Sequence, residues 1–511
     1  MKIIDIQVRR YLLVLVIVSV IIRAFLAFWL EFGNDEVYYV LYALFPDWSH
    51  FDHPPMIGWM MQITSLNLQL NHEFFLRLSS VIFMTFNTFI IFNIGKLIKN
   101  ERTGLYAAIL YNTSIYSGII TGVFILPDTP QNLFWIWSMW LIFNIFKEDT
   151  ITKSAQNKLL LLGLTIGLGM ISKYTSVFLW IGVIGYIIFN DKRWLKQSYL
   201  YISLIISLLV LFPVIYWNYS NDFISFGFHA GRVAMYGKSI RFDYFLTELV
   251  GEIMYCNPIN YAIILLAIYA LFKGKIQMHQ IDKRLLFWIG FPLIFTFLFF
   301  SIFRATLPHW SGPGYNALIM MGAVWLENQN RLKFPVLLKA SIFLIIIVIV
   351  IGSLQINFGI IPVNDQSPYH RIGKDDITLD MYGWRELKPA FESTRNRLIE
   401  EGKMGRDCAI VGDNWFPLAN FDYYIAQPMG MKVYGLGELE KIHKYLWINK
   451  IDIGLQAGKD YWFLTTSRDF KDPDAIYGQQ FEQIISSDTI NIERGGKPVK
   501  RVFVFLLKGL K

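Results

Sequence analysis

The chain has 511 residues, of which 54% are hydrophobic and only 17% are charged, and its mean hydropathy is +0.40. A soluble domain normally carries about 25% charged residues, so this composition excludes an ordinary soluble protein and indicates an integral membrane protein. The net charge of +8 does not indicate nucleic-acid binding, because the basic residues stand between apolar segments, mostly in every second loop.

Eleven apolar segments of roughly membrane-spanning length follow one another along the chain. They cover residues 11–30, 74–95, 104–120, 131–146, 158–172, 174–190, 199–217, 257–272, 285–303, 312–326 and 335–353. The boundaries between 158 and 190 are the least sharply marked, and one segment could be re-entrant. The predicted fold class is therefore a membrane all-α polytopic bundle with about eleven transmembrane helices.

Lysine and arginine predict the orientation, because loops rich in these residues remain on the cytoplasmic side. Basic residues precede the first segment and follow every second one: Lys2, Arg9, Arg10, Lys96, Lys99, Arg102, Lys147, Lys153, Lys158, Lys192, Arg193, Lys196, Lys273, Lys275, Lys283, Arg284, Arg331 and Lys333. The alternate loops carry few, namely Lys173, Arg232, Lys238, Arg241 and Arg304. The N-terminus is thus predicted in the cytoplasm and the chain after residue 353 outside. No small-residue cleavage site follows the first segment, which is predicted to be an anchor.

The long apolar segments end near residue 360, and a small α/β domain is predicted beyond them. Helices are expected near 383–402 and 415–425, and strands near 407–412, 461–466 and 501–507. The predicted domains are a transmembrane part, 1–353, and an extracytoplasmic α/β part, 354–511. Cys256 and Cys408 both fall on the outer side and could pair, but two cysteines do not define a disulfide framework.

The first outer loop, predicted over residues 31–73, gathers acidic groups beside a histidine. Asp35 and Glu36 follow the first apolar segment, and Asp52 and His53 stand directly before two prolines. The loop contains no lysine or arginine, so these carboxylates are either solvated or face a cation from elsewhere in the chain. A water-exposed acidic loop without a function would give the same pattern.

Three further outer segments add polar groups, and each has a structural alternative. They are LPDTP with Asp128, SKYTS with Lys173, and RATLPHWSGPGY with Arg304, His309 and Tyr315. An aspartate beside proline is often a helix N-cap, a lone lysine can reach the interface, and an arginine near tryptophan is often a membrane anchor.

All these groups fall on one predicted membrane face, where cations and acids together suit a substrate with a phosphate head and a lipid tail. A transporter or lipid flippase also places charges in a membrane, but its polar residues belong near the midplane of repeated halves, which this sequence lacks. A ligase of polyprenyl-diphosphate glycans would need more basic residues than Lys173 and Arg304. An enzyme acting on a lipid monophosphate is favoured.

Eight motifs occur in the order NDEVYYV (34–40), FDHPPMIGW (51–59), RLSS (77–80), LPDTP (126–130), SKYTS (172–176), PVIYWNYSNDFISFGFHAGR (213–232), LPHWSGPGY (307–315) and DMYGWREL (380–387). Together they resemble the lipid-linked-sugar glycosyltransferases of the GT-C class. Within it they are similar to the group of protein O-mannosyltransferases and the lipid A aminoarabinose transferase. The similarity runs from about residue 20 to 390 and is specific for the superfamily, not for a substrate.

The resemblance implies a multi-pass enzyme whose first outer loop forms short interfacial helices, with the active site between that loop and the helix ends. Such enzymes move a hexosyl or pentosyl group from a polyprenyl phosphate, usually with inversion and without a nucleotide. The implied setting is a bacterial cytoplasmic (inner) membrane, with undecaprenyl phosphate as carrier and lipid A, another envelope glycan or a protein as acceptor.

The resemblance also implies roles for individual residues. Asp35 matches the acid after the first helix and is expected to act as general base on the acceptor or to orient it, with Glu36 in support. Asp52 and Asp128 match acids that organise the site. The residues expected to bind substrate are Tyr38, His53, Lys173, Arg232, Arg304, His309 and Tyr315.

His53 stands where the aminoarabinose transferase has a lysine, and a neutral imidazole there could donate one hydrogen bond. A divalent metal on Asp52 and Asp128 is one way to manage the phosphate charge. Stabilisation by lysine and arginine alone is the other.

Overall fold

The computed structural model describes residues 2–148, 150–234, 239–329, 334–362 and 367–511. Lys238, Arg331 and Lys333, which entered the prediction of orientation, lie outside these ranges. The chain forms two compact units. The first comprises the chain up to Phe28 and Asp47–Val348, and the second comprises Trp29–Pro46 and Ile349–Lys511. The segment 29–46, predicted with the membrane part, is thus grouped with the C-terminal part.

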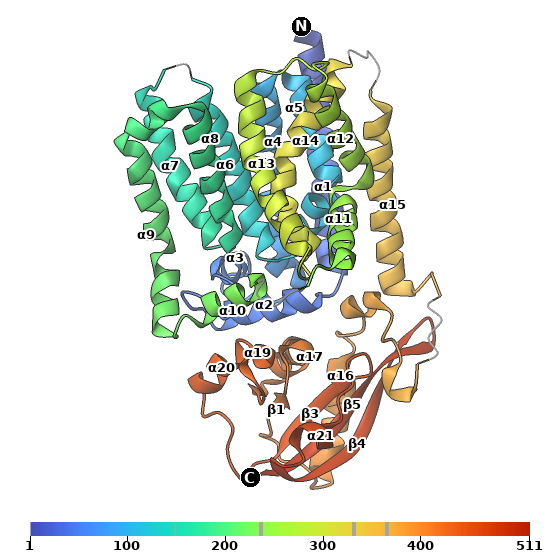
Figure 1. Ribbon diagram of the computed structural model, residues 1–511. Helices are drawn as coiled ribbons and strands as arrows, with labels where there is room; N and C mark the ends of the chain where they lie inside the picture. Colours follow the sequence, from blue (N-terminus) through green and yellow to red (C-terminus); the bar gives the residue numbers. More distant parts are fainter. Residues whose placement is uncertain (1, 149, 235–238, 330–333, 363–366) are drawn as a thin grey trace. The chain divides into compact units, whose positions relative to one another are not determined.

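The first unit is helical (Figure 1). Its elements are α1 (Lys2–Trp29), α3 (Met56–Thr64), α4 (Glu73–Ile98), α5 (Glu101–Thr113), η1 (Tyr116–Ile120), α6 (Asp128–Phe146), α7 (Lys153–Met170), η2 (Tyr174–Val177), α8 (Phe178–Asn190), η3 (Lys192–Lys196), α9 (Ser198–Ser220), α10 (Ile224–Val233), α11 (Phe242–Cys256), α12 (Pro258–Phe272), α13 (Gln280–Ser301), η4 (Pro308–Ser311), α14 (Gly312–Asn328) and α15 (Val336–Phe358). Each of the eleven predicted apolar segments is helical over most of its length.

Five of the described helices are long and apolar enough to cross a membrane: α1, α4, α9, α13 and α15. The number becomes six if α11 and α12, bent by 99° at their junction, count as one span. The chain is therefore a multi-pass membrane protein. Helix length does not support the predicted count of eleven, because α5, α8, α12 and α14 have only 13, 13, 15 and 17 residues.

Small residues let neighbouring helices of this unit approach closely. A Cβ added at Gly104 on α5 would lie 2.4 Å from the carbonyl oxygen of Phe92 on α4. A Cβ added at Gly163 on α7 would lie 2.2 Å from the carbonyl oxygen of Ser203 on α9. Close approach at small residues is how helices associate in lipid, where no hydrophobic effect drives them together.

The second unit combines helices with a sheet. Its elements are α2 (Asn34–Leu44), η5 (Tyr369–Arg371), η6 (Ile377–Met381), α16 (Leu387–Glu400), β1 (Ile410–Gly412), α17 (Trp415–Phe421), η7 (Asp422–Ala426), α18 (Gln427–Met429), β2 (Val433–Gly435), α19 (Leu439–Ile442), α20 (Tyr445–Ile451), β3 (Tyr461–Thr466), α21 (Pro473–Tyr477), β4 (Phe481–Arg494) and β5 (Lys497–Leu510). The predicted small C-terminal α/β region is thus present.

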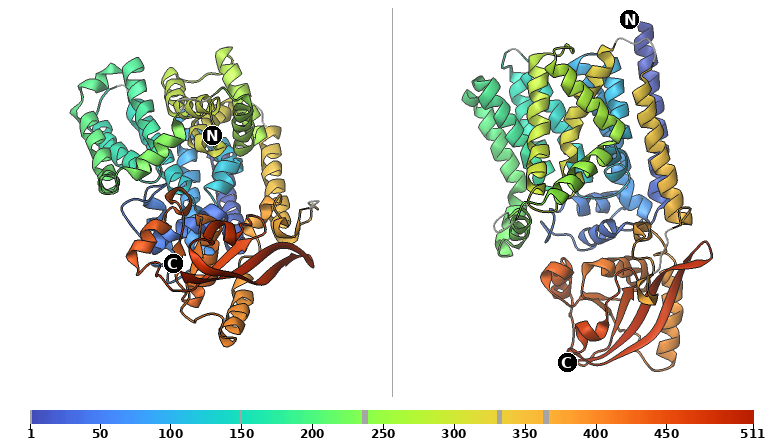
Figure 2. Two further views of the ribbon diagram at one scale, coloured as in Figure 1. Left: turned by 60° about the horizontal axis from the view of Figure 1, so that its bottom comes forward. Right: turned by 45° about the vertical axis from the view of Figure 1, so that its right-hand side comes forward.

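The sheet has the strand order β2-β1-β3-β5-β4. β1 pairs in parallel with β2 and β3, whereas β5 pairs antiparallel with β3 and β4. β4 and β5 run side by side as a long hairpin (Figure 2). The predicted strands correspond to β1, β3 and β5, and β2 and β4 were not predicted.

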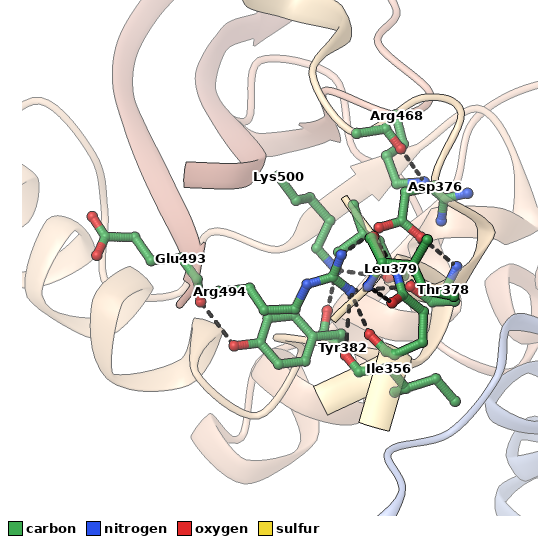
Figure 3. Close-up of polar contacts among 12 residues, drawn as sticks. Ile356, Asp376, Thr378, Leu379, Tyr382, Arg468, Glu493, Arg494 and Lys500 are labelled. Atoms are coloured by element: carbon green, nitrogen blue, oxygen red, sulfur yellow. Dashed lines mark hydrogen bonds and ion pairs between the residues drawn. The ribbon is translucent and has the colours of Figure 1, made fainter. Parts of the chain in front are cut away.

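The segment before α16, which contains the DMYGWREL motif, is held by cations of the β4–β5 hairpin (Figure 3). Arg494 forms an ion pair with Asp376. The ammonium of Lys500 donates to the carbonyl oxygens of Leu379 and Tyr382 at 3.2 and 2.5 Å and lies 3.8 Å from the centre of the Trp384 ring. The DMYGWREL motif is therefore held by contacts within the second unit.

Candidate active site

A cavity of about 300 Å³ opens in the first unit. Its polar lining comes from Lys173, Arg232, His53 and His229, and its apolar lining includes Val177, Phe178, Phe297 and Trp310. The lining residues come from separate stretches of the chain: the loop before α3, the residues after α7, and the elements α10, α13 and η4. Of the residues predicted to bind substrate, His53, Lys173 and Arg232 line the cavity.

Lys173 forms a buried ion pair with Asp128. Its ammonium donates to the two carboxylate oxygens of Asp128 at 2.9 and 2.8 Å. Lys173 is 5% exposed and Asp128 is 3% exposed. Removing either partner would leave an uncompensated charge away from water, so the pair is fixed as a unit.

Local structure explains where the two charges sit. Lys173 follows the end of α7, and its amide donates to the carbonyl of Gly169 at 2.9 Å. Asp128 is the first residue of α6, and the N-cap position is occupied by Pro127. The hydroxyl of Tyr116 donates to the same carboxylate at 3.3 Å. The capping explanation for Asp128 therefore fails, because its carboxylate is engaged by Lys173 and Tyr116.

The FDHPP segment is fixed at the edge of the same cavity. The amide of Met56 donates to the carbonyl of Ile171 at 3.2 Å, which ties the segment to the end of α7. Nε2 of His229 lies 2.7 Å from the carbonyl oxygen of Asp52, and the ring centres of His53 and His229 are 5.9 Å apart. Pro55 directly precedes α3. The contacts of its neighbours thus hold His53 at the cavity wall.

The histidines of this region are neutral at physiological pH. Burial, with smaller contributions from His229 and Lys173, holds the pKa of His53 well below its usual value. Burial also lowers the pKa of His229, and it lowers that of His309 to about 4 although Asp128 opposes the change. These rings therefore serve as hydrogen-bonding groups, while Lys173 and Arg232 supply the positive charge of the cavity.

The two predicted arginines have different surroundings. The guanidinium of Arg232 lies 5.0 Å from the Phe228 ring centre and 5.4 Å from that of Trp310, at the cavity wall. Arg304 is not among the cavity-lining residues, and its guanidinium donates to the carbonyls of Gly231 and Ala234 at the end of α10. Cations at a helix C-terminus stabilise it, so Arg304 holds the helix that presents Arg232.

Buried carboxylates on α11 were not predicted. Glu252 accepts a hydrogen bond from the Tyr315 hydroxyl at 2.9 Å, and Glu248 accepts one from the Thr306 hydroxyl at 2.7 Å. Tyr315 therefore faces α11 and is not part of the cavity lining. Both carboxylates lie between the predicted apolar segments 199–217 and 257–272, where the structure forms α11. The four-residue spacing of the two glutamates within an apolar stretch is the signal that could have placed them on one helix face.

The acids at the start of the first loop lie in the second unit, on α2. Asp35 is exposed in the first turn of α2, whereas Glu36 is 2% exposed and accepts a hydrogen bond from the amide of Gly33 at 3.0 Å. Glu36 thus caps the N-terminus of α2. Tyr38 is buried, with its ring centre 5.1 Å from that of Trp415. Of these three residues, Asp35 is the one whose side chain reaches solvent.

No group of three or more His, Cys, Asp or Glu side chains in the described ranges is arranged to hold a metal ion. Of the two residues considered for a metal, Asp128 has its carboxylate on Lys173, and Asp52 is 7% exposed. Cys256 and Cys408 are both free thiols.

Comparison with known proteins bears on the fold. The structure is similar to that of ArnT from Cupriavidus metallidurans in the apo state, with a TM-score of 0.63 at 12% identity over 96% of this chain and 97% of that chain. ArnT bound to undecaprenyl phosphate gives 0.62 at 11% identity with the same coverage. Residues 52–217 match the family model described as dolichyl-phosphate-mannose-protein mannosyltransferase. The chain has the GT-C fold.

The resemblance inferred from the motifs is thereby confirmed. The family match includes Asp52, His53, Asp128 and Lys173. It therefore covers both partners of the buried Lys173–Asp128 ion pair. It ends before α10 and does not reach Arg232. No curated protein matches the sequence significantly.

Proposed function

We propose that this GT-C protein is a membrane glycosyltransferase that moves one sugar from a polyprenyl-monophosphate donor to an acceptor on the outer face of the cytoplasmic membrane. The observation that carries the proposal is the cavity whose wall combines Lys173 and Arg232 with apolar side chains, Lys173 being ion-paired with the buried Asp128. ArnT, which shares the fold, has been obtained with undecaprenyl phosphate bound.

The cavity offers what a lipid phosphate needs. Lys173 and Arg232 can hold the phosphate oxygens, because charge-assisted hydrogen bonds are the strongest that a protein makes to a phosphate. Val177, Phe178 and Phe297 offer the adjoining prenyl chain an apolar surface. Since Asp128 already balances Lys173, the cavity carries limited net positive charge, which suits a monophosphate better than a diphosphate.

The reaction is a single displacement at the anomeric carbon. An acceptor hydroxyl or amine attacks that carbon as the bond from the carbon to the phosphate oxygen breaks, and the electron pair of this bond leaves with the polyprenyl phosphate. We assign the proton lost by the acceptor to the carboxylate of Asp35 on the ground of its motif alone. Lys173 and Arg232 stabilise the negative charge that develops on the leaving phosphate, so the step needs no metal ion.

The setting follows from the predicted orientation, with the N-terminus in the cytoplasm and the C-terminal α/β domain outside. We place the donor, undecaprenyl phosphate bearing one sugar, in a bacterial inner membrane. The acceptor is a lipid A, another envelope glycan or a protein side chain.

The test is a donor panel. The purified protein in nanodiscs is incubated with radiolabelled polyprenyl-monophosphate and polyprenyl-diphosphate sugars and an envelope extract, and labelled product is measured. Transfer from one monophosphate donor, lost in Lys173→Ala, supports the proposal. The matched control is Lys158→Ala, which removes a lysine at the other end of α7, where it pairs with Glu148 at 3.2 Å. Transfer from diphosphate donors alone would contradict the assignment.

A further inference from the structure

A second cavity, of about 520 Å³, lies in the first unit and takes no part in the proposed transfer. Lys99, Lys283 and His279 line it together with Gln277, Ile276 and Val324. It is formed where α4 ends, where α13 begins, and near the end of α14. Its wall is therefore partly basic and partly apolar.

The two cavities lie at opposite ends of the helices that they share. Lys283 near the start of α13 lines the second cavity and Phe297 near its end lines the first. At 1.5 Å per residue the fourteen residues between them span about 21 Å. Trp310, just before α14, lines the first cavity and Val324 lines the second, about 18 Å along that helix. The second cavity thus belongs to the face predicted to be cytoplasmic.

The acidic side chains around this end of the bundle already have basic partners. Glu327 pairs with Lys99, Asp282 pairs with Lys147 at 2.9 Å, and Glu101 accepts hydrogen bonds from Arg9 and Lys96. In contrast, four basic residues of the α12–α13 connection and the first turns of α13 make no ion pair with a carboxylate in the described part of the chain. They are Lys273, Lys275, Lys283 and Arg284. Of these four, Lys283 lines the cavity and is half-buried.

The groups of this cavity are arranged for an anion with an apolar attachment. Lys99 terminates α4, where its ammonium also donates to the side-chain oxygen of Asn328 at 2.8 Å, so its position is fixed. Ile276 and Val324 give apolar surface beside the cations. Phe272, at the end of α12, is 87% exposed, which is expected of a side chain that faces acyl chains.

We propose that this cavity binds the phosphate-bearing headgroup of an anionic phospholipid, with Lys283 as the principal cation and Lys99 as the second. Basic pockets between helix ends on the cytoplasmic side suit such headgroups, because anionic lipids and basic residues concentrate there. The ligand chemistry is a phosphate, and its source is a membrane lipid rather than a free phosphate compound. The inference rests on residues other than those of the transfer reaction and stands independently of it.

The test measures lipid binding to the intact protein. Detergent-solubilised protein is titrated with phosphatidylglycerol or with phosphatidylcholine, and bound lipid is counted by native mass spectrometry. Lys283→Gln should weaken phosphatidylglycerol binding about fivefold, as expected for one juxtamembrane charge. Arg284→Gln is the matched control, because it removes the same charge from the next position, which is exposed and does not line the cavity. It should change binding less than twofold.

Four outcomes decide the matter. Selective loss in Lys283→Gln with recovery in Lys283→Arg supports the site. Equal losses in Lys283→Gln and Arg284→Gln would overturn it in favour of a diffuse surface charge. Equal binding of phosphatidylcholine would overturn the preference for an anionic headgroup. Competition by inorganic phosphate at concentrations that match the lipid would overturn the lipid source and assign the cavity to a soluble phosphate.

Discussion

The two halves of the first outer loop are built differently. Residues 29–46 belong to the second unit, where the amide of Phe32 donates to the hydroxyl of Tyr424 at 2.8 Å and the carboxylate of Glu31 accepts from the amide of Trp384 at 2.7 Å. Residues 47–73 belong to the first unit, where Met56 is tied to the end of α7. The loop therefore contributes Asp35 to the second unit and His53 to the first.

Under the proposed function, the two regions have distinct roles. The cavity of the first unit is lined by Lys173, whose charge is balanced by the buried Asp128, and we propose that it binds and stabilises a phosphate. Helix α2 of the second unit presents an exposed carboxylate, Asp35, which suits accepting a proton. Variants of the first region should change donor affinity, and variants of the second should change turnover.

The largest effect is expected from Asp35→Asn. The substitution removes a base with little change of volume, so turnover should fall by about a hundredfold or more while donor affinity stays the same. Single-turnover transfer and donor binding are measured side by side. Asp375→Asn, another exposed aspartate of the second unit, is the matched control. Near-normal turnover in Asp35→Asn would remove Asp35 from the role of base.

Lys173→Ala should come next and should act on binding. Loss of one charge-assisted contact to the phosphate should weaken donor affinity about 10- to 100-fold. Because the variant leaves Asp128 buried without its cation, it should also destabilise the fold by about 3–5 kcal/mol. The double variant Lys173→Gln, Asp128→Asn removes both charges and should regain stability but not affinity. Unchanged affinity in these variants would make the pair purely structural.

A smaller effect is expected where α2 is anchored. Glu31→Ala removes the acceptor for the amide of Trp384, a charge-assisted contact of about 1.5–3 kcal/mol, from the segment that leads to α2. Turnover should fall severalfold, with donor affinity unchanged, and Glu31→Gln should recover part of it. A loss of donor affinity instead would contradict the division between the two regions.

The smallest effect on transfer is expected from Asp422, which instead makes stability depend on pH. Burial raises the pKa of this aspartate to about 6, although Tyr445 and Gln427 donate hydrogen bonds to it. The folded state therefore favours the protonated acid. This preference contributes about 3 kcal/mol to the free energy of unfolding. The contribution is fully present below pH 4, near the pKa of the unfolded chain, and is lost as the pH rises through 6.

Asp422→Asn should remove that pH dependence. Amide hydrogen exchange of residues 417–430 in the variant should be less pH-dependent between pH 4 and 7 than in the unsubstituted protein, after correction for intrinsic rates. Parallel profiles in the two proteins would show that Asp422 is not the titrating group.

Much of the architecture was predictable because apolar periodicity is a local property. All eleven apolar segments are helical, and β3 spans the predicted residues 461–466. β2 has three residues and β4 mixes buried and exposed positions irregularly, so neither gives a clear pattern. The place of α2 in the second unit depends on contacts such as Phe32 with Tyr424, 392 positions apart, which no local pattern records.

The site was predictable to a similar degree. Spacing and resemblance led to Lys173, His53 and Arg232, which line one cavity, and to Asp128, which forms an ion pair with Lys173. They did not distinguish Arg304, which supports α10, from Arg232, which lines the cavity. That distinction depends on which carbonyls and rings surround each guanidinium, and these surroundings are set only when the helices pack.

The measurement that tests the central claim most directly is the stoichiometry of a single turnover. Enzyme in nanodiscs is mixed with a doubly labelled polyprenyl-monophosphate sugar and the acceptor fraction, and released polyprenyl phosphate and labelled product are counted together. We predict equimolar release and transfer that both disappear in Asp35→Asn. Tight donor binding without release, for every sugar in the panel, would contradict a transferase and indicate a protein that carries its lipid substrate unaltered.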